Sequence, residues 1–359
     1  MLIRPNPTFC PKPFAPTTAK GTLYHLLVLM AILGGLTLLM FGDVLFGGSG
    51  TVLSHRGADM ASQYAYWRQF GFAQLQNGVM PLWNPHVFCG VPFVGGFQSA
   101  MLYPPNLMYL ALPLDRAINV SFALHVFLMG LFVYLWAWHR KMSPPAGLLA
   151  GALAMFGGPY FLHVYAGHVC LMSTAVWAPL LFLAADALLT EPKLKWVLTG
   201  SLAAAMSMLA GNPQCTYYTF LAMLLYVGAN ALGSLGRLRV RGSVKLAVLL
   251  ACVLLAGASL AAAQLLTAMG AAGESPRGAG LTVQYAGSFS FPPENFLTFL
   301  APGFFGLNDS HPYHYSANEA QEIRGSRPMV LVSQLVLETN MNTKQLASLQ
   351  EGLAEFLRT

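Results

Sequence analysis

The chain has 359 residues, of which 55% are hydrophobic and only 9% are charged. Soluble globular domains carry about 25% charged residues, so this composition excludes a soluble protein and indicates a polytopic membrane protein. The formal net charge of +6 would suit a nucleic-acid partner. The basic residues are spread between apolar segments and form no single basic face, which argues against that class.

The apolar stretches predict the number of membrane spans. A helix needs about 20 apolar residues to cross the hydrocarbon core of a bilayer. A Pro-rich segment, 1–22, precedes a long first stretch without a small-residue cleavage site, so we expect a cytoplasmic lead and a retained anchor. Seven stretches qualify as spans, the third and fifth being short or interrupted by glycine: 23–46, 117–139, 146–164, 169–190, 195–211, 214–233 and 244–268.

The Lys and Arg residues between the spans predict the orientation. With the N-terminus in the cytoplasm, they collect in the cytoplasmic segments, whereas the outer connections near residues 165 and 212 contain none. This is the positive-inside pattern, and it places the first loop, 47–116, outside the membrane. The cytoplasmic cations are Arg4, Lys12, Lys20, Arg140, Lys141, Lys193, Lys195, Arg237, Arg239, Arg241 and Lys245.

The first outer loop gathers polar and aromatic side chains that the rest of the chain lacks. Asp59 begins a stretch, 59–76, in which apolar residues recur at near-helical spacing, so we predict an amphipathic helix on the outer membrane surface. Prolines and glycines then predict an irregular folded loop, followed by a short helix at about 105–112. The recurring residues are Tyr64, Trp67, Phe70, Phe72 and Leu75.

The C-terminal part differs from the spans. Pro292 and Pro293 precede Glu294, which predicts another membrane-skimming helix on the outer side. From residue 307 the composition becomes that of a soluble tail, with a strand expected at 329–337 and an amphipathic helix near the end. We therefore divide the chain into a lead, 1–22, a transmembrane domain, 23–306, and an atypical tail, 307–359.

Several motifs resemble one family. The loop sequence GADMASQYAYWRQFGFAQLQNGVMPLWNPHVFCGVPF, followed by FQSAMLYPPN, resembles the YfhO-like bacterial membrane proteins. Their first outer loop shows a Gly-x-Asp or Gly-Asp, a Gln-Tyr, a Pro-x-Trp, a Gly-x-Pro and a Tyr-Pro. The later AGNPQCTYYTF, QLLTAMGAAGESPR and FPPENFLTFLAPGFFG look like further landmarks in the family's order, so the resemblance covers about 20–306.

That family resembles the GT-C class of integral membrane glycosyltransferases. The resemblance implies an all-α polytopic fold in the bacterial inner (plasma) membrane, with about seven transmembrane helices and interfacial amphipathic helices in a large first outer loop. It also implies transfer of a sugar from a polyprenyl-phosphate donor to a cell-envelope glycan, lipid or protein acceptor, with Asp59 at the position of the catalytic carboxylate. The tail departs from the pattern, because family members continue through further spans; a truncated, inactive form and a compact variant both fit this departure.

Asp59 can also be interpreted from its chemistry. Glycosyl transfer with inversion needs a base for the acceptor proton, or a carboxylate that holds a cation against the leaving phosphate. The alternative is a helix N-cap without chemistry. The sequence specifies no cofactor, and a divalent metal at Asp59 is compatible with the second role. Asp43, near the outer end of the first span, is a secondary candidate, because carboxylates within the membrane are costly.

The loop offers further candidates for substrate binding. His55, Arg56 and Arg277 are cations that suit a lipid-linked phosphate, whereas we interpret Arg68 as an interfacial or snorkelling charge. Aromatic faces stack on sugars, and amides bind their hydroxyl groups. The candidates for contacts with the sugar are therefore Trp83, Asn84, His86, Gln63 and Tyr64, and Gln98 is a weaker candidate. Scaffold roles remain open for the same residues, with Trp83 as an interface anchor and Asn84 as a turn former before Pro85.

Other patterns carry weaker signals. His86, His163 and His168 lack the ordered spacing of a zinc site, and we expect interhelical hydrogen bonds from His125 and Gln264. One disulfide among Cys89, Cys170 and Cys215 is compatible with their outer positions; otherwise they are small apolar residues. Two other function classes stay open: a multi-span transporter or lipid flippase, in which polar residues would line a midplane pathway, and a non-catalytic membrane scaffold.

Overall fold

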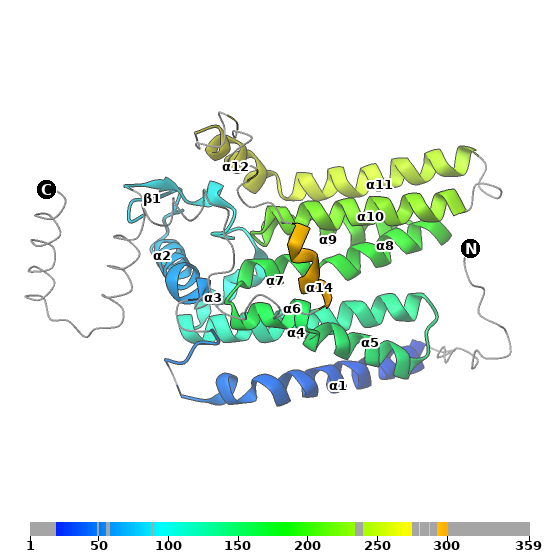
Figure 1. The fold of residues 1–359 in the computed structure, drawn as a ribbon, viewed down its shortest axis with the longest axis horizontal. Coiled ribbons are helices and arrows are strands. Elements are labelled where there is room, and N and C mark those ends of the chain that lie inside the picture. The colour runs from blue at the N-terminus through cyan, green and yellow to red at the C-terminus, as the bar shows by residue number, and fades with distance from the viewer. Residues whose placement is uncertain are drawn as a thin grey trace, which may run out of the picture. The chain divides into compact units, whose positions relative to one another are not determined.

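The computed structural model describes residues 19–48, 50–54, 58–87, 89–233, 240–274, 280, 287 and 293–300. Within these ranges the chain is mostly helical (Figure 1). Their only sheet is a two-stranded antiparallel pair, in which β1 (Trp83–Asn84) lies beside β2 (Val91–Pro92). The predicted all-α architecture is therefore confirmed for this part of the chain.

The chain divides into two compact units, 1–278 and 279–359. The first unit contains all of the first loop and the long helices. In the second, the described residues form the short helices η5 (Pro293–Phe296) and α14 (Leu297–Leu300), where a helix was expected from Glu294 onward. The predicted tail, 307–359, with its strand and helix, lies outside the described residues.

The long helices of the first unit lie side by side with nearly parallel axes (Figure 1). They are α1 (Ala19–Phe46), α4 (Leu114–His139), α5 (Pro144–Phe156), α8 (Ala178–Thr190), α9 (Leu194–Leu209), α10 (Pro213–Gly233) and α11 (Val240–Leu260). The shorter elements are η1 (Met60–Tyr64), α2 (Ala65–Gln76), η2 (Val94–Gly96), η3 (Pro104–Leu107), α3 (Met108–Ala111), α6 (Gly158–Tyr165), α7 (Val169–Ala175) and α12 (Ala262–Glu274).

Four helical segments in the described ranges are long and apolar enough to cross a membrane: Lys20–Phe46, Leu114–His139, Pro144–Tyr165 and Val169–Thr190. They coincide with the first four predicted spans and support an integral membrane protein. The predicted seventh span, 244–268, is not one straight helix: Val244–Leu260 and Ala262–Gly273 are apolar enough together to form a fifth span, but the helix axis bends by 75° between them. The predicted spans 195–211 and 214–233 form α9 and α10, which do not meet the same criterion.

Successive long helices alternate in direction, so the first loop, the turns at 166–168 and 211–212, and α12 meet at one end of the bundle (Figure 1). We call this the loop end. Helix α4 starts beside the loop and has 26 residues. At about 1.5 Å per residue it is roughly 39 Å long, so Arg140, which follows it, lies at the opposite end of the bundle. Lys193 and Lys195, at the start of α9, share this opposite end. Arg140, Lys193 and Lys195 thus follow the predicted charge asymmetry along the bundle, whereas Arg68 in the first loop and Arg116 in the first turn of α4 lie at the loop end.

Small residues allow the helices to approach closely, as is usual between membrane helices. Between α4 and α5, a Cβ added at Gly151 would lie 2.9 Å from the carbonyl oxygen of Gly130. Between α9 and α11, a Cβ added at Gly257 would lie 2.7 Å from the Cβ of Ala204. These contacts fix the bundle that carries the loop.

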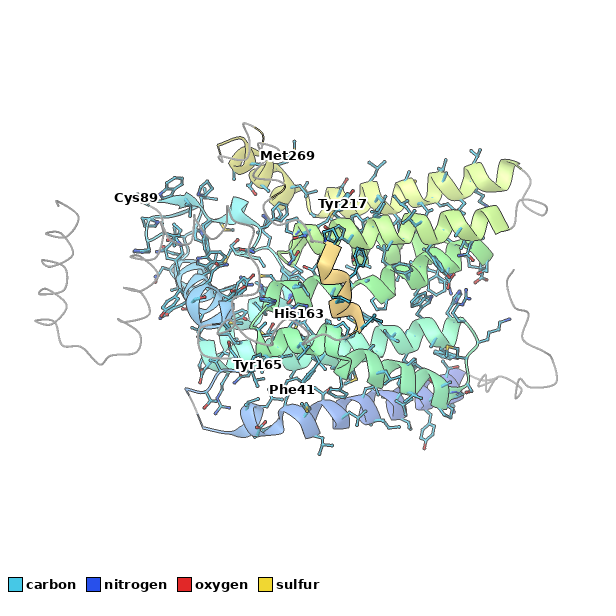
Figure 2. All side chains as sticks on the ribbon, viewed as in Figure 1. Phe41, Cys89, His163, Tyr165, Tyr217 and Met269 are labelled. Carbon is cyan, nitrogen blue, oxygen red and sulfur yellow. The ribbon has the colours of Figure 1, made fainter. Side chains whose placement is uncertain are left out.

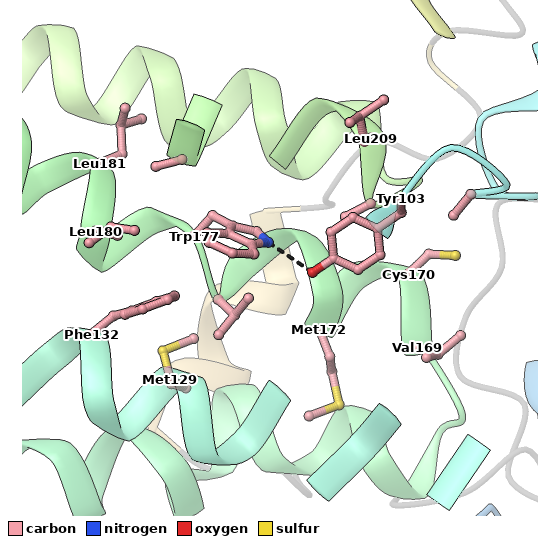
Figure 3. Close-up of a cluster of buried hydrophobic side chains, with 14 of the residues drawn as sticks. Tyr103, Met129, Phe132, Val169, Cys170, Met172, Trp177, Leu180, Leu181 and Leu209 are labelled. Atoms are coloured by element: carbon pink, nitrogen blue, oxygen red, sulfur yellow. Dashed lines mark hydrogen bonds between the residues drawn. The ribbon is translucent and has the colours of Figure 1, made fainter. Parts of the chain in front are cut away.

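A buried polar cluster joins the loop to the bundle. The Tyr103 hydroxyl lies 2.9 Å from Nε2 of His125 in α4. It also accepts a 2.9 Å hydrogen bond from Nε1 of Trp177, which Figure 3 shows. Nδ1 of His125 lies 2.6 Å from the Ser121 carbonyl oxygen, so a neutral imidazole protonated at Nδ1 donates to Ser121 and accepts from Tyr103. Every hydrogen-bonding atom at the centre of this cluster is satisfied.

The prediction of interhelical hydrogen bonds for His125 and Gln264 is wrong, because the side chains of both residues bond to the first loop instead. His125 bonds to Tyr103 of the loop, and Nε2 of Gln264 in α12 donates a 2.7 Å hydrogen bond to the Val94 carbonyl oxygen of the loop. The physical reason is that loop backbone and side chains enter the bundle end, where they offer nearer partners than neighbouring helices do. Both polar residues tether the loop.

Buried phenols of the loop give a prediction for alkaline pH. Burial raises the pKa of Tyr64, Tyr103 and Tyr109, whereas in the unfolded chain they titrate near 10. Stability from these residues is therefore fully present below pH of about 10 and is lost as the pH rises above it. In ultraviolet titration of the folded protein, we expect at least these three of the 14 tyrosines to remain protonated until the helices unfold. Ionisation of all of them with intact helical dichroism would contradict this.

Candidate functional site

The first turns of α4 hold the chain where it leaves α1. Oδ2 of Asp115 accepts a 2.6 Å hydrogen bond from the Gly50 amide, and Oδ1 of Asn119 accepts one of 2.9 Å from the Leu53 amide. Nδ2 of Asn119 donates to the Thr51 carbonyl oxygen at 2.8 Å. These bonds pair backbone groups of the irregular segment that follows α1, and they fix the point at which the loop begins.

The predicted helix at 59–76 is confirmed as η1 and α2, which together run from Met60 to Gln76. Asp59 occupies the N-cap position, yet its carboxylate makes no capping hydrogen bond. Instead its Oδ2 lies 3.2 Å from Nε2 of His168, and the two side chains are 53% and 35% exposed. Asp59 therefore directs its carboxylate to another segment, so N-capping does not explain its position.

A tight turn brings His168 to Asp59. Gly167 has a φ of +71°, and a Cβ there would lie 2.7 Å from the Met60 amide nitrogen, so the turn at 166–168 packs directly against the start of η1. Gly211, with a φ of +101°, plays the same part between α9 and α10, where a Cβ would lie 3.0 Å from the Phe97 carbonyl oxygen. Glycine suits both positions, since it adopts positive φ without strain.

A second histidine extends the contact. Nδ1 of His168 lies 2.9 Å from Nδ1 of His163 in α6, with the ring centroids 5.1 Å apart. The residues Asp59, His168 and His163 thus form a linear chain of hydrogen-bonding groups, which we call the Asp59 chain. Its members come from the first loop, the 166–168 turn and α6.

Arg68 does not occupy the interfacial position predicted for it. Its side chain is among the largest that are fully buried, with 1% exposure. Its Nη1 donates to the carbonyl oxygens of Gln98 and Ser99, and its Nη2 lies 3.4 Å from Sγ of Cys170. The helix presents Arg68 to the inner side of the loop, where these acceptors replace water. The guanidinium therefore fastens α2 to residues 98–99 and α7.

Two more candidates lie beside this contact. Nε2 of Gln63 donates a 3.1 Å hydrogen bond to Oε1 of Gln98, so these amides bind one another. Tyr64 is buried, and its pKa is raised by burial first and then by the neighbouring Cys170 and Asp59. Its hydroxyl therefore stays protonated at physiological pH, next to the carboxylate of the Asp59 chain.

The remaining loop candidates form a separate group. Asn84 is buried, and its Oδ1 accepts a 2.9 Å hydrogen bond from the His86 amide, which is the predicted turn-forming role. The His86 ring meets Phe70 edge-on at 5.5 Å. Trp83 is 52% exposed, and Gly90 packs on its indole so closely that a Cβ would lie 2.5 Å from Cζ2. Trp83 and His86 thus present rings near solvent.

Several expectations have other outcomes. His55, Arg56 and Arg277 lie outside the described residues. Oδ1 of the exposed Asp43 accepts a 2.8 Å hydrogen bond from the next amide, at Val44. The cysteines Cys89, Cys170 and Cys215 are free, so no disulfide joins them; Cys170 is buried, whereas Cys89 lies exposed at the edge of the loop (Figure 2).

The donor set does not fit a resident metal. Among the described residues, no group of three or more His, Cys, Asp and Glu side chains is placed to hold a metal ion. The members of the Asp59 chain contact one another through their ligand atoms and do not converge on one point. Neither a zinc site of His86, His163 and His168 nor a divalent cation held by Asp59 is therefore supported by these residues.

Sequence reasoning missed a buried carboxylate in α8. Oδ2 of Asp186 accepts a 2.7 Å hydrogen bond from Nε1 of Trp136, and its Oδ1 accepts one of 2.6 Å from the Tyr226 hydroxyl. Nη1 of Arg140 lies 3.4 Å from Oδ2. The signal was present, because a carboxylate within a predicted span is costly unless it is paired. Asp186 lies toward the end opposite the loop and fastens α4, α8 and α10 to one another.

Comparison with protein-family models, curated proteins and solved structures finds no match for this chain. Its function must therefore be argued from its residues and from the geometry of the loop end.

Proposed function

We propose that the protein transfers a sugar from a polyprenyl-phosphate donor to a cell-envelope acceptor at the loop end, with Asp59 as general base. The observation that carries this proposal is the Asp59 carboxylate itself: it is half-exposed, it makes no capping bond, and it pairs with His168. A carboxylate placed in this way can reach a substrate hydroxyl while its second oxygen is held.

The chemistry follows from that position. The acceptor hydroxyl gives its proton to Asp59 as its oxygen attacks the anomeric carbon, and the bond from that carbon to the phosphate oxygen breaks. General-base assistance of this kind contributes about 10²–10⁴-fold to a rate. The leaving polyprenyl phosphate carries the electron pair of the broken bond. His55, Arg56 and Arg277 are the cations that we assign to it, since Arg68 is buried and already bonded.

The surroundings suit a lipid-linked donor. The amphipathic helix α2 and helix α12, which follows the 75° bend after α11, lie at the same end of the bundle, where a donor with a long apolar chain would approach through the membrane. We assign the sugar to the exposed rings of Trp83 and His86, with Gln63, Tyr64 and Asn84 as the supporting polar residues. We propose that the transfer takes place in the outer leaflet of the bacterial inner membrane.

A sided assay separates transfer from transport. Purified protein is reconstituted into vesicles of membrane lipid with a radiolabelled polyprenyl-phosphate sugar in one leaflet. We expect labelled acceptor and free polyprenyl phosphate only when donor and acceptor share the leaflet that the first loop faces. Movement of intact donor between leaflets, without release of its sugar, would support a flippase and contradict the proposal. If the donor keeps its sugar and stays in its original leaflet, the result would contradict the proposal and favour a non-catalytic scaffold.

The orientation itself has a natural reporter. Cys89 is exposed at the loop end, whereas Cys170 is buried and Cys252 lies in the apolar helix α11. In a variant with Cys10→Ser and Cys215→Ser on intact cells, we expect a membrane-impermeant maleimide to label the protein, and a further Cys89→Ser change to abolish the label; Cys215 is replaced because it is half-buried at the same end of the bundle. Labelling that requires permeabilised cells would place the loop in the cytoplasm and contradict an outer-leaflet site.

A further inference from the structure

At the end of the bundle opposite the loop, cations from two helices lie around one tryptophan. The rings of His139, the last residue of α4, and Trp196, in the first turn of α9, have centroids 5.7 Å apart. Nζ of Lys195 lies 4.5 Å from the centroid of the same indole, and Arg140 follows His139 directly. The contact between the two helix ends therefore brings together cations that are distant in the chain.

The guanidinium of Arg140 is held by the neighbouring helices. Its Nη1 lies 3.4 Å from both carboxylate oxygens of Asp186 in α8 and donates a 3.2 Å hydrogen bond to the Tyr226 hydroxyl in α10. The Asp186 side chain is 5% exposed, whereas the Arg140 side chain is 51% exposed. The exposed part of the guanidinium is therefore oriented, and guanidinium groups bind phosphate through paired hydrogen bonds.

Lys141 occupies a backbone position that usually holds glycine. Its φ is +61°, and the amides of Lys141 and Met142 donate to the carbonyl oxygens of Trp138 and Ala137. This hydrogen-bond pattern ends many helices, with glycine as the usual residue at the left-handed position because a Cβ is strained there. A lysine at this position sacrifices backbone stability and places an exposed charge next to Arg140.

Few carboxylates are available to balance these charges. Among the described residues of the first unit, the carboxylates at this end of the bundle belong to Asp186 and Glu191. Asp186 is bonded inside the bundle, and Glu191 pairs with Lys193. Lys141 and Lys195 are both exposed, so this end carries an excess of positive charge at its surface.

We propose that Arg140, Lys141 and Lys195, which we call the basic patch, bind the headgroup of an anionic phospholipid. Helix α4 is long and apolar enough to cross a membrane, so the patch at its end lies at the level of lipid phosphates. Leu194 and Leu198 of α9 are 71% and 61% exposed beside the patch, where acyl chains would pack. Basic groups between membrane helices attract anionic headgroups in this way. This inference does not depend on sugar transfer.

Lipid binding can be measured without any assay of transfer. The full-length protein in nonionic detergent micelles is titrated with short-chain phosphatidylglycerol, with phosphatidylcholine of the same chain length and with inorganic phosphate. Native mass spectrometry counts the bound molecules. We expect phosphatidylglycerol to bind about ten-fold or more tightly than phosphatidylcholine, and inorganic phosphate at the same concentration to leave it bound.

Lys141→Gly separates binding from stability. Glycine accepts the positive φ without strain, so the free energy of unfolding should not fall, whereas the affinity for phosphatidylglycerol should fall about five-fold with the lost cation. Addition of Lys195→Gln should bring the loss to about 25-fold. The matched control is Arg116→Gln, which removes an exposed cation at the other end of α4 and should keep the affinity of the wild type.

Equal affinities of the wild type for the two phospholipids would overturn the proposal. Equal losses in Arg116→Gln and in the double variant would also overturn it, because they would reflect net charge alone. Displacement of phosphatidylglycerol by inorganic phosphate would show a site for free anions and contradict a lipid site. Because none of these measurements involves a sugar donor, failure of the basic patch and failure of the proposed function are distinguishable.

Discussion

Asp59→Asn is expected to lower the rate of sugar transfer by about 10²–10⁴-fold, the usual contribution of a general base. Asparagine has nearly the same shape, and its amide can still contact His168, but it cannot accept the acceptor proton. The initial rate of labelled product in membranes supplied with polyprenyl-phosphate sugar measures this effect. Donor binding should remain within a few-fold of the wild type, because the change removes an interaction made in the transition state.

Asp43→Asn is the informative comparison for this variant. Asp43 is also an acidic residue near the loop end, but it is exposed, and its carboxylate accepts a hydrogen bond from the adjacent amide. We expect its replacement to leave the transfer rate within about two-fold, as for surface changes away from a site. If Asp43→Asn loses transfer and Asp59→Asn keeps the full rate, the general base would be Asp43, near the end of α1.

Tyr103→Phe is expected to lower the free energy of unfolding by about 2–4 kcal/mol. The change removes a single hydroxyl but leaves two buried partners, Nε2 of His125 and Nε1 of Trp177, without a hydrogen bond. Each buried polar group that loses its partner costs about 1–3 kcal/mol. Reversible unfolding in mixed micelles, followed by circular dichroism, measures the difference between the variant and the wild type.

Tyr66→Phe on α2 is the matched control, because that side chain is 65% exposed and its hydroxyl is accessible to water. We expect Tyr66→Phe to change the free energy of unfolding by less than about 0.5 kcal/mol. Equal stability of Tyr103→Phe and the wild type would mean that the buried cluster does not hold the loop on the bundle. In that case the geometry of the loop end would need another cause.

Local features were predictable from the sequence. The apolar composition indicated a helical membrane protein. The apolar residues within 59–76 recur about once per helical turn, and this segment forms the predicted helix. The turn at Asn84 follows from an Asx residue before proline. Each of these depends on interactions between residues that are close in the chain, which a sequence pattern records directly.

Contacts between distant segments were not predictable. The pairing of Asp59 with His168 depends on the direction of successive helices and on the turn at Gly167, which places one segment against the other. Hydropathy likewise records how apolar residues 244–268 are, but it does not record the 75° bend that separates α11 from α12. Burial of Arg68 was missed for the same reason, since its acceptors lie on other segments.

The place of the chemistry can be measured directly with a polyprenyl-phosphate sugar that carries a photoactivatable group on the sugar. Protein in lipid nanodiscs is irradiated with this donor, and the modified residues are identified by mass spectrometry. We predict adducts between Asp59 and Gln98 and around His163 and His168, and their loss when unlabelled donor competes. Competable adducts confined to the opposite end of the bundle, around Arg140 and Asp186, would contradict an active site at the loop end.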